Sequence, residues 1–389
     1  MKTGKGNTVP VVLLVLAAVA LLVPIYSLPI WWVSLEAPNY PEEAFPDGVR
    51  ILFHLNGVFN GCRVVENTEI QEGDALDCVH EMDTINHYVG MYPIAAGGPI
   101  EVSFSMFVVA LLGVLLVGFL LEKPALRISF TGLGLVAIGV WMALTWYSEG
   151  GLQYHDSGYL AGRALVLGED GDEDETDEGL TPGEAVIARL KASLEGSGVG
   201  AEAPAEKAPR TEKEAAIAQL RSAFLADQRG PEAERVSWKG NGQQLLSWHF
   251  RKTLGRYFND PTRIEPMVAG MARSAGIALW GTLIGMAVLI VAARRTNGPF
   301  HWLMLLLPAT LPVLFVMEYA AWLWWYGHNM SDMGAFTLKP FMPTVFGQGK
   351  VAQFTTSSYP EMGFWLMVAF SALLISAALL RRRDLRGGS

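Results

Sequence analysis

The chain has 389 residues, of which 51% are hydrophobic and only 17% are charged, and its formal net charge is −9. Soluble globular proteins carry about 25% charged residues, so the charge of this apolar chain must be concentrated in a few segments. The acidic balance excludes a basic nucleic-acid-binding protein, and the apolar content excludes a wholly disordered acidic chain. The composition therefore predicts a membrane protein with sizeable parts outside the bilayer.

Six apolar segments are each long enough to cross a bilayer, which takes about 20 residues in a helix. None of them has the polar stripe of an amphipathic soluble helix. They lie at residues 9–33, 102–121, 128–147, 270–293, 300–326 and 364–380. The sequence therefore predicts an all-α polytopic membrane protein with six transmembrane helices.

The first of these segments can be interpreted in two ways. Lys2 and Lys5 precede the apolar run 11–23, as in a secretory signal. Apolar character continues to Val33, however, without a small-residue cleavage site. The pattern favours an uncleaved anchor helix, and removal of the segment as a signal is the alternative.

Basic residues in short flanking segments mark the cytoplasmic side of a membrane protein. Every flanking cluster falls on one side if both termini are cytoplasmic, and the interfacial Trp and Tyr residues fall on the other. The basic residues are Lys2, Lys5, Lys123, Arg127, Arg294, Arg295, Arg381, Arg382, Arg383 and Arg386. We therefore expect a bacterial cytoplasmic (inner) membrane protein with both termini inside the cell.

This orientation assigns each remaining segment either to the membrane or to one side of it. We expect an anchor at 1–33, helices at 100–147, 270–326 and 364–389, and extracytoplasmic segments at 34–99, 148–269 and 327–363. The first two extracytoplasmic segments together carry a net charge of −16. The cytoplasmic segments are short and lack a GxxxxGK[ST] phosphate loop. The sequence thus predicts the lipid bilayer as a partner, with no nucleotide and no nucleic acid.

Segment 34–99 is predicted to form a small α+β domain. Residues 49–55 have the β-branched and aromatic content of a strand, and Asn56-Gly57 is a turn signal. Cys62 and Cys78 are the only cysteines of the chain. In an oxidising compartment a disulfide between them is favoured, and free metal-binding thiols are the alternative.

The same segment carries the densest group of possible metal ligands. Imidazole and thioether groups together suit copper, whereas the spacing matches no closed zinc motif. The candidates are His54, His80, Met82, His87 and Met91. The alternative is that these residues pack and hydrogen-bond within the domain. Copper is therefore a possible cofactor rather than an established one.

The third extracytoplasmic segment, 327–363, is too apolar for a solvated linker. We expect it to fold back either onto the membrane surface or against segment 34–99. In the second case His328 and Met330 would join His80 and His87 around one metal site.

Segment 148–269 is predicted to be a partly disordered helical insertion. Residues 169–178 are a block of like charges, which stays solvated and disordered. Helices are expected at 182–194, 211–225 and 241–258, with a linker at 196–209. The third helix is amphipathic, so it either lies in the membrane interface or packs on segment 34–99.

Ionisable residues at membrane depth are costly and usually functional. Glu318 is the acidic residue well inside a predicted span, and Pro308 and Pro312 are placed to kink the same helix. Glu318 is either a proton or cation site or a structural carboxylate, for which Arg273 is the candidate partner. No histidine lies in a span interior, so haem b ligation is not expected.

The run from Ile85 to Met91, Ile-Asn-His-Tyr-Val-Gly-Met, follows a region that begins Val-Ser-Leu-Glu-Ala-Pro-Asn-Tyr-Pro at residues 33–41. This pattern resembles uncharacterised polytopic membrane proteins associated with gene clusters for nitrous oxide reductase, a copper enzyme. The resemblance covers less than a quarter of the chain. It implies an accessory role beside a periplasmic copper oxidoreductase or its assembly factors, in maturation or electron supply.

Two functions follow from these patterns. The first is a non-catalytic inner-membrane accessory protein that presents an extracytoplasmic surface, with copper as a possible ligand, to a periplasmic respiratory metalloenzyme. The alternative is a transporter or channel that uses Glu318 in the proline-kinked fifth helix.

Overall fold

The computed structural model describes residues 8–64, 76–168, 211–228, 236–294, 299–335, 338–351 and 353–387. Within these parts, six helices are long and apolar enough to cross a membrane. The prediction of six spans is thereby confirmed. The helices are α1 (Val9–Ser27), α3 (Pro99–Leu120), α4 (Pro124–Tyr147), α9 (Pro261–Ala292), α10 (Pro299–Leu306) with α11 (Leu311–His328), and α12 (Met362–Gly387).

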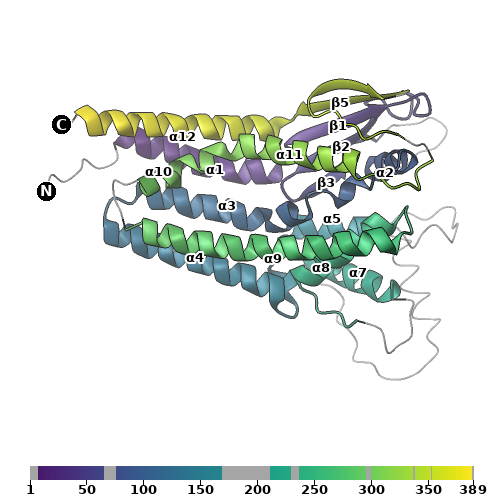
Figure 1. Ribbon diagram of the computed structural model, residues 1–389. Coiled ribbons are helices and arrows are strands. Elements are labelled where there is room, and N and C mark those ends of the chain that lie inside the picture. Colours follow the sequence, from purple (N-terminus) through teal and green to yellow (C-terminus); the bar gives the residue numbers. More distant parts are fainter. Residues whose placement is uncertain are drawn as a thin grey trace.

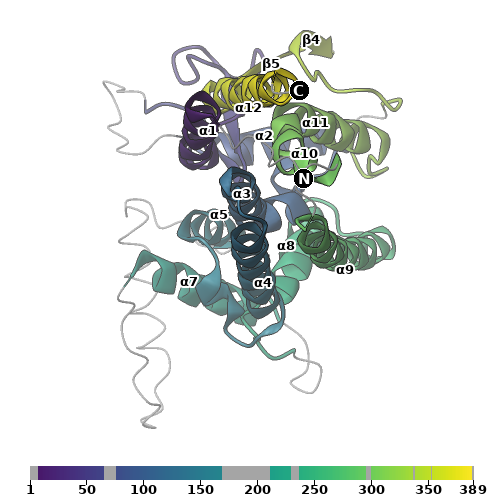
Figure 2. The ribbon, with the colours of Figure 1, turned by 90° about the vertical axis from the view of Figure 1, so that its left-hand side faces the viewer.

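The six spans run side by side, and the start of α1 and the end of α12 lie at one end of the bundle, which we call the terminal end (Figure 1). Helix α1 packs on α12 and on α3, while α4 packs on both α3 and α9. Viewed from the terminal end, α3 lies between the α1–α12 pair and the α4–α9 pair (Figure 2). One apolar core joins α1, α3, α10 and α12, and a second joins α3, α4 and α9.

The fifth span is interrupted, as its prolines predicted. Helix α10 ends at Leu306, the 3-10 turn η5 (Pro308–Thr310) follows, and α11 starts at Leu311. Pro308 and Pro312 each lack the N–H that an uninterrupted helix would use. The interruption separates the short helix α10 from the longer helix α11.

The opposite end of the bundle, which we call the sheet end, carries a five-stranded antiparallel sheet (Figure 1). The strand order is β3-β2-β1-β5-β4. The strands are β1 (Trp31–Glu36), β2 (Val49–His54), β3 (Gly57–Asn60), β4 (Gly347–Val351) and β5 (Phe354–Pro360). The predicted strand at 49–55 and the turn at Asn56-Gly57 are therefore present.

The first span is shorter than predicted. Helix α1 ends at Ser27, and Trp31 already begins β1. Apolar composition continues to Val33, but Pro29 interrupts the helix and the Trp-Trp-Val run favours a strand. The aromatic residues that were counted as helix thus belong to the sheet.

The sheet joins two segments that are more than 300 residues apart. Strand β1 pairs with β2 on one side and with β5 on the other, with Ser34 opposite Ser357. Segment 327–363 therefore folds against segment 34–99, the second of the two predicted alternatives. The predicted α+β domain is consequently not confined to residues 34–99.

Short helices complete the sheet end. They are α2 (Cys78–Tyr88), η1 (Ile94–Ala96), η2 (Gly151–Tyr154), α5 (Ser157–Gly168), α7 (Glu212–Ala226) and α8 (Gly242–Gly255). Helix α8 packs on α3, α4, α5, α9 and η1.

Helices α7 and α8 match the helices predicted at 211–225 and 241–258. The acidic block 169–178, the helix predicted at 182–194 and the linker 196–209 lie outside the described residues.

A disulfide joins Cys62 to Cys78, whose Cα atoms are 6.0 Å apart. It links the chain after β3 to the first residue of α2. In the chain-entropy model, closing a loop of this length stabilises the fold by about 3 kcal/mol. The predicted pairing is confirmed, so neither sulfur is available as a thiolate ligand.

The buried hydroxyl of Ser358 connects the sheet to the bundle through hydrogen bonds. Ser358, which is fully buried on β5, accepts a hydrogen bond from Trp31 Nε1 at 2.8 Å and donates one to the Val345 carbonyl at 2.9 Å. The Tyr319 hydroxyl of α11 lies 3.2 Å from the same oxygen. A strand from each half of the chain and α11 therefore meet at this side chain.

We predict that Ser358→Ala lowers the thermal stability of the detergent-solubilised protein. The variant leaves the buried Trp31 N–H without an acceptor, which costs about 1–3 kcal/mol. Thr356→Ala on the same strand is the matched control, because Thr356 is only half-buried. Equal melting temperatures for the two variants would contradict this role of Ser358.

Candidate functional site

Helix α2 carries most of the predicted ligands, and local interactions fix its start. The Asp77 carboxylate caps it by accepting hydrogen bonds from the amides of Val79 and His80 at 2.9 and 3.2 Å. His80, Thr84 and His87 are spaced four and three residues apart, so they share one face of the helix. The opposite face, with Met82 and Ile85, is buried in the core of the sheet end.

The half-buried face of α2 that carries these three residues meets Tyr257, which follows α8. The Tyr257 hydroxyl lies 3.4 Å from His80 Nδ1 and 3.5 Å from Thr84 Oγ1. The His87 ring stacks on the Tyr257 ring with centroids 5.2 Å apart, and it lies 5.0 Å from the Phe258 ring. Burial lowers the pKa of His87, so this imidazole is neutral at physiological pH.

The structure brings together two of the seven predicted metal ligands, His80 and His87, around Tyr257. Met82 and Met91 are only 3% and 6% exposed and belong to the apolar core. His54 lies on β2 against Phe59, with ring centroids 4.9 Å apart. His328 stacks on Trp324 of its own helix, and Met330 packs at the edge of the core.

Among the described residues, no three His, Cys, Asp or Glu side chains are placed to share a metal ion. The four predicted histidines therefore do not converge on one centre. With the thioethers in the core and the cysteines in a disulfide, the donors at this face are two imidazoles and one phenol. Copper binding stays a prediction.

Asp83 is a buried carboxylate on the core side of α2. It is 2% exposed, and its Oδ1 accepts a hydrogen bond from the Ile94 amide at 2.5 Å. Burial raises the pKa of Asp83 to about 7, because burial outweighs the Ile94 hydrogen bond and the more distant Arg256. This carboxylate anchors the turn η1 to α2.

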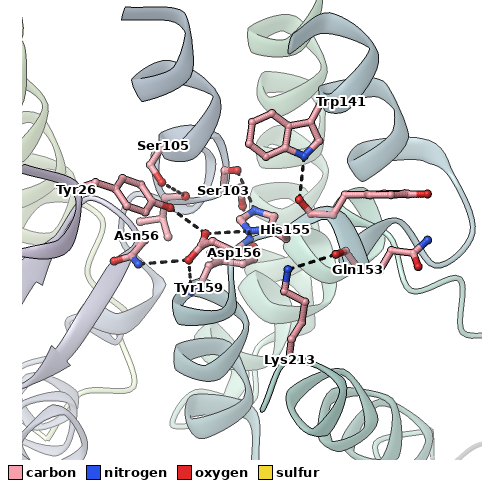
Figure 3. A network of polar contacts seen from close by, with 12 residues as sticks. Tyr26, Asn56, Ser103, Ser105, Trp141, Gln153, His155, Asp156, Tyr159 and Lys213 are labelled. Atoms are coloured by element: carbon pink, nitrogen blue, oxygen red, sulfur yellow. Dashed lines mark hydrogen bonds and ion pairs between the residues drawn. The ribbon is translucent and has the colours of Figure 1, made fainter. Parts of the chain in front are cut away.

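A second buried polar group lies where four elements meet (Figure 3). His155 is 2% exposed, and its Nδ1 lies 3.1 Å from Asp156 Oδ2. Asp156 also accepts hydrogen bonds from the Tyr26 hydroxyl of α1 at 2.9 Å and from the Tyr159 amide of α5 at 2.8 Å. Asn56, in the β2–β3 turn, approaches the other carboxylate oxygen.

This network is structural rather than nucleophilic. His155 Nε2 faces the backbone carbonyl of Ser103 at 3.1 Å, while the Ser103 hydroxyl bonds to Tyr159 instead. A Ser-His-Asp triad needs the hydroxyl on the imidazole. Burial alone would raise the pKa of Asp156, but hydrogen bonds from His155, the Tyr159 amide and Tyr26 lower it to about 2.

The two polar residues predicted inside the bilayer are not paired. Arg273 is exposed and its Nε donates to the Ala269 carbonyl of its own helix at 3.2 Å. Glu318 is within electrostatic reach of Glu101, another carboxylate. Within the described ranges Glu318 forms no ion pair.

An open groove lies at the tip of the sheet end, between the β1–β2 connection and the β4–β5 turn. Its walls combine prolines and aromatic rings with two carboxylates, and they include no basic side chain. The Tyr40 hydroxyl at its rim donates to Glu81 Oε2 of α2 at 2.9 Å. We call it the acidic groove; its lining is Glu36, Ala37, Pro38, Tyr40, Pro41, Glu42, Phe45, Pro46, Gly48, Gln353 and Thr355.

Sequence reasoning missed Tyr257, Glu101, the His155–Asp156 pair and the acidic groove. Each acquires its surroundings from segments that are far apart in the chain. The one available signal was that His155 and Asp156 lie in the short stretch after the third span. Nothing local marks them as buried.

Comparison with known proteins gives no relative from which a role could be transferred. No protein-family model matches the chain, and neither a curated protein nor a solved structure is significantly similar to it.

We predict that Asp156→Asn destabilises the protein at neutral pH and flattens the acid limb of its stability profile. The folded-state pKa is about 2, below the ordinary value, so the Asp156 carboxylate stabilises the fold above about pH 4 and this contribution is lost as the pH falls through 2. Melting temperatures between pH 2 and 7 measure the effect. Glu149→Gln, at an exposed position, is the control, and an unchanged pH profile for Asp156→Asn would contradict the prediction.

Asp83 should show the opposite pH dependence. Its folded-state pKa is raised to about 7, so the folded state holds the proton more tightly and stability falls as the pH rises from about 4 to 7. Asp83→Asn keeps a carbonyl that accepts from the Ile94 amide and removes the charge. We expect the melting temperature of the variant to change less between pH 5 and 8 than that of the wild type. A larger change in the variant would rule out a buried protonated Asp83.

Proposed function

We propose that this chain is an accessory protein of a bacterial cytoplasmic membrane, holding a rigid extracytoplasmic domain against a partner in the exported compartment. The observation that carries the proposal is the composite sheet, in which β1 and β5 pair over six residues from Trp31 to Glu36. Two connections of the membrane bundle are thereby fused into one platform. A platform of this kind is expected where a surface must be held in a fixed orientation.

Two features support the orientation with the sheet end outside. The Cys62–Cys78 disulfide belongs to the sheet end, and disulfides persist in oxidising compartments. The terminal end carries Arg127 and the Arg381–Arg383 run, as expected for a cytoplasmic face.

The acidic groove is the surface that fits a partner segment best. Glu36 and Glu42 are exposed in it, and Pro38, Tyr40 and Phe45 provide apolar contact beside the charges. The exported segments of the chain are strongly acidic, which favours association with a basic surface. We propose that the partner inserts an extended basic segment into this groove.

The resemblance of Ile85–Met91 suggests a periplasmic respiratory metalloenzyme, or one of its assembly factors, as the partner. The motif begins in the last turn of α2 and continues to Met91, and Tyr40 of the groove is hydrogen-bonded to Glu81 of the same helix. The groove and the resembling motif are therefore connected through α2. The proposed role needs no metal ion in this chain.

The alternative function, transport through Glu318, has less support. In the described parts of the six spans, Glu318 and Arg273 lie towards the sheet end, whereas Arg127, His301 and Arg381 lie towards the terminal end. The helix segments between these levels carry apolar and small polar residues. In these described segments a proton or ion would thus meet no acidic or basic side chain between the two levels.

We predict that a photocrosslinking amino acid at Pro38, in the full-length protein in its native membrane, forms one discrete adduct with an exported protein. Replacing Glu36 and Glu42 by Gln should reduce the adduct about fivefold, because surface charge pairs contribute about 0.2–1 kcal/mol each. Gel mobility and mass spectrometry measure the yield and the identity.

The same crosslinker at Leu133, an exposed apolar residue of α4, is the control and should give no protein adduct at that mass. No adduct at Pro38, an adduct with a second copy of this chain alone, or a yield unaffected by the double replacement would contradict the accessory role.

A further inference from the structure

A pocket opens where the bundle meets the sheet, between the β2–β3 hairpin, the start of α3 and one face of α11. Its cavity volume is about 70 Å³. Its walls are predominantly aromatic: Phe53, Phe315, Tyr319, Trp322 and Tyr326. Gly97 forms part of the lining, and a side chain there would meet the Tyr326 hydroxyl within 3.0 Å.

One carboxylate lines this pocket, and a second lies behind its wall. Glu318 is exposed at its mouth. Glu101, on the first turn of α3, lies behind Trp322, whose Nε1 donates to Glu101 Oε1 at 3.4 Å. The other oxygen, Glu101 Oε2, is buried and has no hydrogen-bond partner. Among the described residues, no Lys or Arg forms an ion pair with either carboxylate.

The two carboxylates at this pocket have no positive charge to balance them among the described residues. Two carboxylates within electrostatic reach of each other repel, and a buried carboxylate oxygen without a partner costs free energy. A cation in the pocket would offset the repulsion between the two carboxylates. The aromatic faces are also negative, and they attract a cation placed within about 6 Å of the ring centre.

The chemistry of the walls selects the kind of cation. Ca²⁺ and Mg²⁺ need six or more oxygen ligands, whereas most of this lining is carbon. An ammonium ion with an organic substituent matches both parts, because its charge faces the carboxylates and its carbon atoms face the rings. We propose that the pocket binds a small organic ammonium ion between Glu318 and the ring of Trp322, with Glu101 adding its negative charge from behind that ring.

This site is separate from the acidic groove and does not depend on the proposed accessory role. The ammonium group has two sources, a free amine or the headgroup of an ethanolamine phospholipid in the adjacent leaflet. Both present the same cation to the pocket.

The test is calorimetric titration of the full-length protein in detergent with tetramethylammonium chloride, against sodium chloride at equal ionic strength. We expect saturable binding of tetramethylammonium that sodium does not reproduce. Glu318→Gln and Trp322→Leu should each weaken it about tenfold, which corresponds to about 1.4 kcal/mol. Glu149→Gln removes an exposed carboxylate at the sheet end of α4 and should leave binding unchanged.

A melting curve for each variant shows that it is folded, and Glu101→Gln provides a second, independent removal of a carboxylate. Absence of saturable binding, equal binding of sodium, or Glu318→Gln binding as tightly as Glu149→Gln would overturn the proposal.

Titration in nanodiscs then identifies the source. If phosphatidylethanolamine competes with tetramethylammonium and phosphatidylglycerol does not, the headgroup is the occupant. If neither lipid competes, the occupant of the pocket is a free amine.

Discussion

The pairing of β1 with β5 is the constraint on which the rest of the structure depends. Strand β1 continues from α1 and β5 leads into α12, so this ladder joins the first and last spans at the sheet end. The same two helices pack along their length in the bundle. Because backbone hydrogen bonds fix the strand register, they also fix where α11 and the acidic groove lie relative to the spans. Ser358 extends this link to α11.

Buried polar groups then define how the smaller elements attach. Asp156 collects donors from α1, α5 and the β2–β3 turn, and Asp83 holds η1 against α2. The two carboxylates differ in their surroundings. Hydrogen bonds and a neighbouring imidazole favour the charged form of Asp156, whereas burial favours the neutral form of Asp83. Both serve to position loops rather than to carry out chemistry.

The surfaces that remain open lie at the sheet end and near its junction with the bundle. The acidic groove combines carboxylates with proline and aromatic side chains, and the pocket beside Glu318 combines carboxylates with aromatic walls. Each is formed by segments from different parts of the chain.

The sequence by itself determined the six spans, the proline break before α11, the disulfide and the hairpin turn at Asn56-Gly57, because apolar length, proline chemistry and cysteine pairing are local or compositional signals. It could not separate the end of α1 from the start of β1, since Trp31–Val33 is apolar in either conformation. Only the tertiary structure decided that Met82 and Met91 belong to the core, that His80 and His87 share Tyr257, and that Glu318 faces Glu101 instead of Arg273. The physical reason is that ligand sets and charge pairs depend on which helix faces meet, and residues 31–60 meet residues 347–360 through backbone hydrogen bonds that leave no side-chain signature.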